Sequence, residues 1–185
     1  MEKGLTVRKI VIAGVLGAVA ILLGVTRLGY IPVPTAAGNA TIMHIPAIIG
    51  GILQGPLVGM IIGLIFGITS FLNATIPLFK DPFIAILPRL FIGVMAYLTY
   101  RGIRNLNEYV AVGMASFVGS LTNTVLVLVL AVFRGYLAPG VAWAVAVTNG
   151  IPEAVVSVVL TLAVVATGMK IGHWGRKKSK ISGDF

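Results

Sequence analysis

The chain has 185 residues, of which 58% are hydrophobic and only 10% are charged. A soluble domain carries roughly 25% charged residues, so this composition excludes one. The net charge is +9, but the basic residues form neither a patch nor a stripe interleaved with aromatic residues, and we expect no nucleic-acid partner. The chain contains no cysteine, which excludes disulfides, thiolate metal sites and cysteine nucleophiles.

Long apolar runs, bounded by charged residues or Pro/Gly clusters, predict membrane-spanning helices. A bilayer core about 30 Å thick needs roughly 20 apolar residues of helix. Six candidate runs cover residues 10–28, 43–53, 57–72, 83–100, 109–133 and 141–169. The expected fold class is therefore an all-α membrane protein, a bundle of six transmembrane helices that forms one domain over residues 1–185.

Two of these runs allow more than one interpretation. Residues 43–53 are too few to cross a bilayer alone, so we expect a tilted or partly re-entrant segment, or a helix that starts earlier in the preceding loop. The first run follows Lys3, Arg8 and Lys9, an arrangement also found in signal peptides. Its length, and the lack of a small-residue cleavage site directly after it, favour a retained span.

The distribution of basic residues predicts the orientation, because basic loops remain on the cytoplasmic side. With the N-terminus inside, six crossings also place the C-terminus in the cytoplasm. The loops at 30–41, 73–81 and 135–140, which are rich in Pro, Gly and aromatic residues, are then extracellular. Ten of the 14 basic residues fall on the inner side: Lys3, Arg8, Lys9, Arg101, Arg104, Lys170, Arg176, Lys177, Lys178 and Lys180.

Small residues recur four apart in the first run. Ala13 and Gly17 form one pair, and Gly14 and Ala18 form a second pair on the adjoining helix face. Missing side chains at this spacing let another helix backbone approach closely. Two interpretations remain open: packing within the bundle, or a docking surface for a separate membrane subunit.

Polar residues inside the predicted helices indicate a site near the outer surface. A charged group at the bilayer centre costs about 2.5 to 3.5 kcal/mol on insertion scales, so each one needs a partner or a wet cavity. Arg89 lies in the fourth run, Asn123 in the fifth, and Asn149 and Glu153 in the sixth. Counting along the helices places all four in the outer half of the bundle.

Two arrangements of these residues are possible. Arg89 and Glu153 can form a buried ion pair that holds two helices in register, with the asparagines bridging backbone groups. Alternatively, the four residues line a pocket in which Arg89 donates to a carboxylate or carbonyl of a ligand. Pro152, directly before Glu153, frees a backbone carbonyl one turn earlier, and such groups in membrane helices often face a cavity.

The loop at 30–41 is the candidate cover for this opening. It carries no charge, its two prolines stiffen it, and the segment around Asn39 can act as a hinge. The plain alternative is that it is only a connector. His44, at the start of the second run, is a packed or capping residue or a ligand contact. Two histidines far apart in the chain cannot form a metal site.

No catalytic motif is present. The chain has no Gly-x-Ser-x-Gly, no His-Glu-x-x-His, no phosphate loop and no paired carboxylates at useful spacing. We therefore expect no metal, no cofactor and no enzyme activity in this chain. A transporter or binding subunit is favoured.

Several segments together resemble the substrate-binding (S) component of energy-coupling factor (ECF) vitamin transporters. They are GYIP at residues 29–32, TIMHIPAIIG at 41–50, Gly55-Pro56, and the glycines from Gly59 to Gly67. The resemblance covers nearly the whole chain and is greatest to pantothenate-type members, although riboflavin, folate and thiamine-precursor relatives are built alike. It implies a subunit of a prokaryotic cell-membrane importer that tilts over in the bilayer to release its vitamin inside.

The resemblance also implies particular residue roles and partners. The vitamin pocket lies near the outer surface under the first outer loop, and Asn39, Arg89, Asn123, Asn149 and Glu153 fall at matching positions. Ala13, Gly14, Gly17 and Ala18 correspond to the motif that docks on a membrane coupling subunit, and two ATPase subunits supply the energy. This chain mixes Gly with Ala in that motif where the family repeats Ala.

Two classes of function follow. The first is a vitamin-binding subunit of an importer, with pantothenate favoured and Arg89 as the partner of its carboxylate. The second is a structural or assembly membrane protein with no ligand, in which the polar residues only lock helices together. A tightly packed outer half with Arg89 bonded to Glu153 would favour the second, and a membrane enzyme ranks third.

Overall fold

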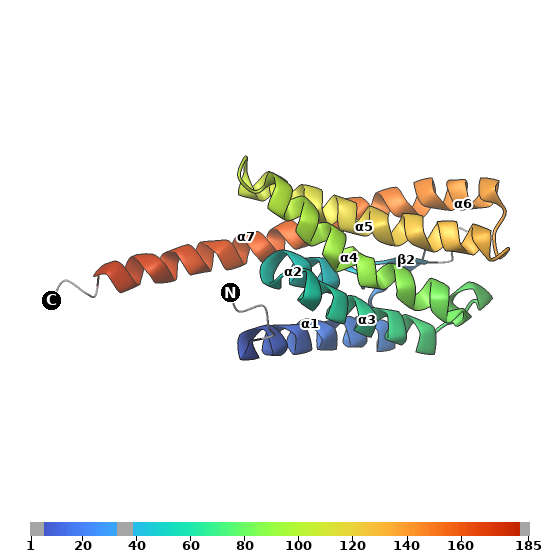
Figure 1. Cartoon of the computed structure of the whole chain (residues 1–185), viewed down its shortest axis with the longest axis horizontal. Helices are drawn as coiled ribbons and strands as arrows, with labels where there is room; N and C mark the ends of the chain where they lie inside the picture. Colours follow the sequence, from blue (N-terminus) through green and yellow to red (C-terminus); the bar gives the residue numbers. More distant parts are fainter. Residues whose placement is uncertain (1–5, 33–38, 182–185) are drawn as a thin grey trace.

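Helices form most of the part of the chain that the structure describes (Figure 1). The structure is a computed structural model that covers residues 6–32 and 39–181, without the side chains of Pro32, Asn39 and residues 169–181. In chain order its elements are α1 (Val7–Val25), β1 (Tyr30–Pro32), β2 (Asn39–Thr41), α2 (Ile45–Gln54), α3 (Pro56–Leu72), η1 (Pro77–Lys80), α4 (Pro82–Ile103), α5 (Glu108–Phe133), α6 (Pro139–Val145), η2 (Ala146–Gly150) and α7 (Ile151–Ile181). Here η1 is a 3₁₀-helical turn and η2 a π-helical turn.

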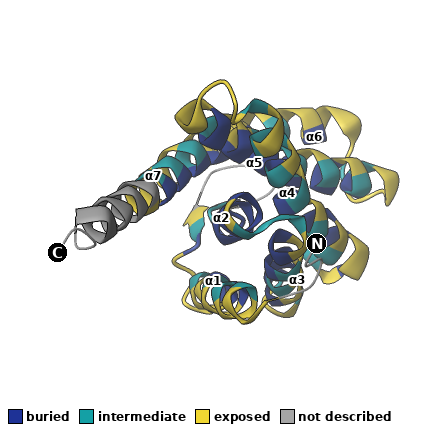
Figure 2. Ribbon diagram, turned by 60° about the vertical axis from the view of Figure 1, so that its left-hand side comes forward, coloured by how far each residue is buried: buried dark blue, intermediate teal, exposed yellow. Residues whose placement is uncertain are grey.

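The helices pack around α2. Helix α3 packs against α1 and α4, α4 against α5, and α5 against α7, while α2 contacts all five of these helices. Figure 2 shows buried faces turned inward and exposed faces turned outward around the bundle. The outward faces carry large apolar side chains such as Val15, Leu64 and Val129. Helices α1, α4, α5 and the run Pro139–Gly168 are long and apolar enough to cross a bilayer, as expected for a membrane protein.

The observed helix boundaries lie within three residues of the expected ranges at every end but one. The exception is the last run, which passes from α6 through η2 into α7 and ends at Ile181, not at residue 169. Lys and Arg are good helix formers, so the helix continues beyond the apolar residues. Helix α1 begins and α7 ends at the same end of the bundle, where α7 projects beyond the other helices (Figure 1).

The segment between α1 and α2 contains a short β-ribbon, which the all-α expectation did not include. Strands β1 and β2 pair antiparallel, with Tyr30 opposite Thr41 and Ile31 opposite Ala40. Backbone N–H and C=O groups that lie over an apolar bundle need partners. Here the two ends of the loop supply them to each other, so the ribbon forms although each strand has only three residues.

Helix α2 is short and is enclosed by the bundle. It begins at Ile45, and not earlier in the loop, and its ten residues span about 15 Å. Eight of those ten residues are buried. The chain then reverses at Gly55, whose φ of 102° is a conformation that favours glycine, and Pro56 starts α3.

Three glycines allow α2, α3 and α4 to approach closely. A Cβ atom on Gly93 would lie 2.5 Å from Cα of Gly59, and one on Gly59 would lie 2.9 Å from Cα of Gly51. Backbone atoms at such distances cannot move aside as the end of a side chain can. The contact therefore depends on hydrogen as the side chain of each residue.

We predict that Gly93→Ala destabilises the protein. Alanine normally stabilises a helix relative to glycine by about 1 kcal/mol, but at Gly93 overpacking against backbone should cost about 1 to 3 kcal/mol. Gly102→Ala in the same helix is the matched control, because nothing lies within 4 Å of its added Cβ. Thermal unfolding in detergent should give a lower Tm for Gly93→Ala and an equal or higher Tm for Gly102→Ala. Equal values for both variants would contradict this packing.

An ion pair joins the start of α4 to the end of α5. Arg134 Nε lies 2.9 Å from Asp81 Oδ2, and Arg134 Nη2 donates to Asp81 Oδ1 at 3.2 Å. Asp81 also caps α4 by accepting from the amide of Phe83 at 3.0 Å. Burial alone would raise the pKa of Asp81, but the Arg134 and Phe83 hydrogen bonds and the Arg134 charge hold that pKa below its ordinary value.

Acid should weaken this connection. Because the folded-state pKa of Asp81 is depressed, its contribution to stability is present above the ordinary carboxyl pKa of about 3.9 and is lost as the pH falls through the lower folded value. Between about pH 5 and pH 2, the Tm of the unmodified protein should fall more steeply than that of Asp81→Asn. Arg134→Gln should behave like Asp81→Asn. Parallel curves for all three proteins would show that the pair adds nothing.

Candidate functional site

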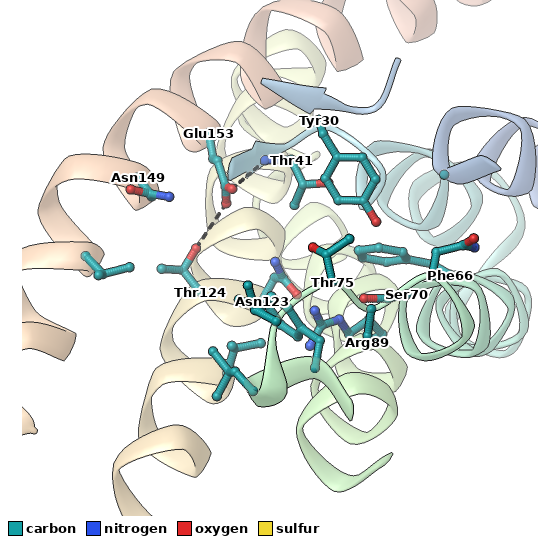
Figure 3. A pocket seen from close by; sticks show the side chains of 18 of the residues that line it. Tyr30, Thr41, Phe66, Ser70, Thr75, Arg89, Asn123, Thr124, Asn149 and Glu153 are labelled. Atoms are coloured by element: carbon teal, nitrogen blue, oxygen red, sulfur yellow. Dashed lines mark hydrogen bonds between the residues drawn. The ribbon is translucent and has the colours of Figure 1, made fainter. Parts of the chain in front are cut away.

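A cavity of about 290 Å³ opens at the end of the bundle that carries the β-ribbon and the α3–α4 loop. Figure 3 shows polar side chains from several elements turned toward it. Four of the residues expected from the sequence line it together: Arg89 from α4, Asn123 from α5, Asn149 from η2 and Glu153 from α7. Tyr30, Thr41, Phe66, Ser70, Thr75, Phe79 and Thr124 are among the other lining residues.

Arg89 is the buried cation of this cavity, with 2% of its surface exposed. Its Cζ lies 5.3 Å from the ring centre of Phe66 and 5.0 Å from that of Phe79. Its Nη1 donates to the backbone carbonyl of Ile84. Two aromatic rings and a carbonyl therefore fix the guanidinium in the cavity wall.

One edge of the Arg89 guanidinium has no hydrogen-bond partner in the described part of the chain. Its Nε is buried and has no hydrogen-bond partner among the residues that the structure describes. Since Nη1 is held by Ile84, the side formed by Nε and Nη2 is left, and these two parallel donors match the two oxygens of a carboxylate.

Glu153 fastens the β-ribbon to the bundle. Its Oε1 accepts the backbone N–H of Thr41 in β2 at 2.6 Å, and its Oε2 accepts from the hydroxyl of Thr124 in α5 at 3.5 Å (Figure 3). Within the described ranges, Asp81–Arg134 is the ion pair found, so Arg89 and Glu153 do not form the buried pair considered from the sequence. The carboxylate of Glu153 instead holds strand β2 beside the cavity.

Asn123 and Asn149 add neutral hydrogen-bonding groups. Their side chains are 4% and 3% exposed, and neither Oδ1 of Asn123 nor Nδ2 of Asn149 finds a partner in the described part of the chain. Asn149 lies in the π-helical turn just before Pro152, which has no N–H to give to the carbonyl four residues back. Buried polar atoms are normally bonded, so a cavity with an unpaired acceptor and unpaired donors suits a polar ligand.

Two further residues predicted at the site are His44 and Asn39. His44 is fully buried at the start of α2, makes no capping hydrogen bond and is not among the residues that line the cavity. Asn39 belongs to β2, but its side chain lies outside the described residues. Phe66, Phe79 and Thr124 also line the cavity but were not predicted from the sequence. The only signal for Phe79 was its place in the loop at 73–81, and Phe66 and Thr124 carry no distinguishing signal within their helices.

The four small residues of α1 divide into two faces. Ala13 is buried, and a Cβ atom on Gly17 would lie 2.7 Å from Ile65 Cδ1 of α3. Gly14 and Ala18 are exposed on the outer face of α1, and nothing lies within 4 Å of a Cβ on Gly14. Ala13 and Gly17 thus pack inside the bundle, while Gly14 and Ala18 face outward.

Comparisons with known proteins agree with this architecture. The pantothenic acid transporter PanT of Lactococcus lactis subsp. cremoris (strain MG1363) is 34% identical over an alignment of 150 positions, which covers 68% of this chain and 75% of that protein. The solved structure of ThiT from Listeria monocytogenes matches with a TM-score of 0.63 at 18% identity, over 88% of this chain and 93% of that chain, and therefore shares the fold. Residues 8–165 match the family described as ECF transporter, substrate-specific component. The resemblance identified from the sequence is confirmed, and the chain belongs to this family of transporter components, which is not a family of enzymes.

Proposed function

We propose that this chain captures pantothenate on the outer side of a prokaryotic cell membrane and delivers it inward as part of an ATP-driven importer. The observation that carries the proposal is buried Arg89 in the cavity wall, whose Nε has no hydrogen-bond partner among the described residues. The 34% identity to a pantothenic acid transporter supports the choice of vitamin.

The chemistry of the cavity suits this substrate. Pantothenate carries a carboxylate at one end, an amide in the middle and two hydroxyl groups at the other end. In the proposed arrangement Arg89 binds the carboxylate, while Asn123 and Asn149 bond to the amide and hydroxyl groups, beside Glu153. The cavity of about 290 Å³ lies near the lower limit for small-molecule sites, which is appropriate for a compact vitamin. A role as a structural protein without ligand is disfavoured because Arg89 and Glu153 are not paired.

The proposed topology has six crossings and both termini in the cytoplasm. The shared end of α1 and α7 supports it (Figure 1), and so does the excess of Lys and Arg at the two ends of the chain. The β-ribbon and the cavity then face the exterior. The short helices α2 and α3 complete the crossings, with α2 enclosed by the other helices and α3 exposing one face at the surface of the bundle.

The proposed partners are a membrane coupling subunit and two ATPase subunits, which hydrolyse the ATP. The outward face of α1 at Gly14 and Ala18 supports a docking role, because small residues there let a helix of another protein approach closely. Ala13 and Gly17 serve the internal packing of α1 on α3 instead.

Replacing Arg89 tests the substrate site. Arg89→Ala should weaken pantothenate binding by about 2 to 5 kcal/mol, since it removes one partner of a buried charge-assisted contact. Isothermal titration of purified protein in nanodiscs measures the effect. Arg104→Ala, which removes an exposed cation at the opposite end of α4, should leave the affinity nearly unchanged. An unchanged affinity in Arg89→Ala would make Arg89 structural, and an unmodified protein that binds no B vitamin would refute the proposal.

Bulk on the outward face of α1 tests the docking role. Gly14→Leu should reduce pantothenate uptake by cells at least about tenfold while the purified variant keeps its affinity, because the added side chain separates the helices that must touch. Gly140→Leu is the control, since nothing lies within 4 Å of a Cβ there and the residue is at the opposite end of the bundle. Full uptake in Gly14→Leu would exclude this face as the contact.

A further inference from the structure

The α3–α4 loop is anchored to the bundle on both sides of Phe79. Leu78 is buried in a small apolar cluster with Ile84, Val127 and Ala131. Asp81 pairs with Arg134 at the end of α5. Phe79, between these two anchors, is held at a defined place above the cavity.

At this position Phe79 contacts the buried guanidinium of Arg89. Its ring centre lies 5.0 Å from Cζ of Arg89, as close as the ring of Phe66 at 5.3 Å. Phe66 is 1% exposed inside α3, whereas Phe79 is half-buried in η1. One ring thus belongs to the bundle wall and the other to a surface loop.

An aromatic ring beside a guanidinium acts in two ways. It attracts the cation through its quadrupole while leaving the N–H groups, which lie in the guanidinium plane, free to bond to another group. It also keeps water from the charge, so an ionic contact made there is less screened. Both effects strengthen the bond to an anionic ligand and have little influence on a neutral one.

We infer that Phe79 is a positioning residue that makes the cavity selective for a carboxylate. It acts through Arg89, by holding the guanidinium beside the cavity and by shielding its charge from water. This inference rests on the proposed function. The α3–α4 loop is then part of the anion-binding site as well as a connection between helices.

A structural role for Phe79 would have a different signature. Phe79 also packs against the apolar cluster of Leu78, and loss of that packing alone would loosen the loop and weaken every ligand by the same factor. The distinguishing quantity is therefore the ratio of two affinities, one for pantothenate and one for panthenol, in which an alcohol replaces the carboxylate.

The experiment titrates both compounds into the full-length protein in nanodiscs by calorimetry. Phe79→Leu should weaken pantothenate about 3- to 30-fold, the range of a desolvated cation–π contact, and panthenol less than about twofold. Phe79→Tyr should restore the ratio, because it keeps the aromatic face. Phe83→Leu is the matched control: Phe83 lies 5.1 Å from Cζ of Arg134 but does not line the cavity, and its ratio should equal that of the unmodified protein.

The other outcomes overturn the inference. Equal weakening of both ligands, or no weakening of either, would show that Phe79 does not act on the charge. Phe79→Met, which keeps an apolar side chain of similar volume, replaces Phe79→Leu if that variant does not fold; failure of both to fold would assign Phe79 to the structure of the loop. An unmodified protein that binds neither compound refutes the proposed function itself, and the inference with it, whereas normal pantothenate binding with an unchanged ratio refutes the inference alone.

Discussion

The end of the bundle that carries the cavity is organised around a positive charge that has no ion-pair partner among the described residues. A guanidinium with 2% of its surface exposed is tolerated in an apolar bundle only if its surroundings replace the solvation it has lost. Phe66, Phe79 and the carbonyl of Ile84 supply part of that replacement. The rest is missing along one edge, and in the proposed function the carboxylate of the ligand supplies it.

The helix packing and the cavity depend on different residue types. Gly51, Gly59 and Gly93 bring α2, α3 and α4 into backbone contact. Gly63 and Gly67 likewise bring α3 against the backbone of α4 at Arg89 and Ile86. The cavity itself is lined by larger and polar side chains. Close glycine packing therefore supports the helix that carries Arg89.

The sequence was sufficient for the features that depend on local pattern. Apolar runs located the helices to within a few residues, and counting along them predicted that Arg89, Asn123, Asn149 and Glu153 share one end, which the structure brings to one cavity. The features that depend on helix rotation were not predictable. Phe66 is one apolar residue among many in α3, and the β-ribbon forms only because residues 30–32 and 39–41 meet above the folded bundle. Glu153 was expected at the ligand, but its first partner is a backbone amide of the ribbon.

That contact between Glu153 and Thr41 has a consequence for how the β-ribbon can vary. The donor is a main-chain N–H, which every residue type except proline possesses. The side chain at position 41 can therefore be exchanged while the ribbon remains attached to α7 at this point. The attachment of the ribbon and the chemistry that its side chains present are thus controlled by separate atoms, and one can evolve without loss of the other.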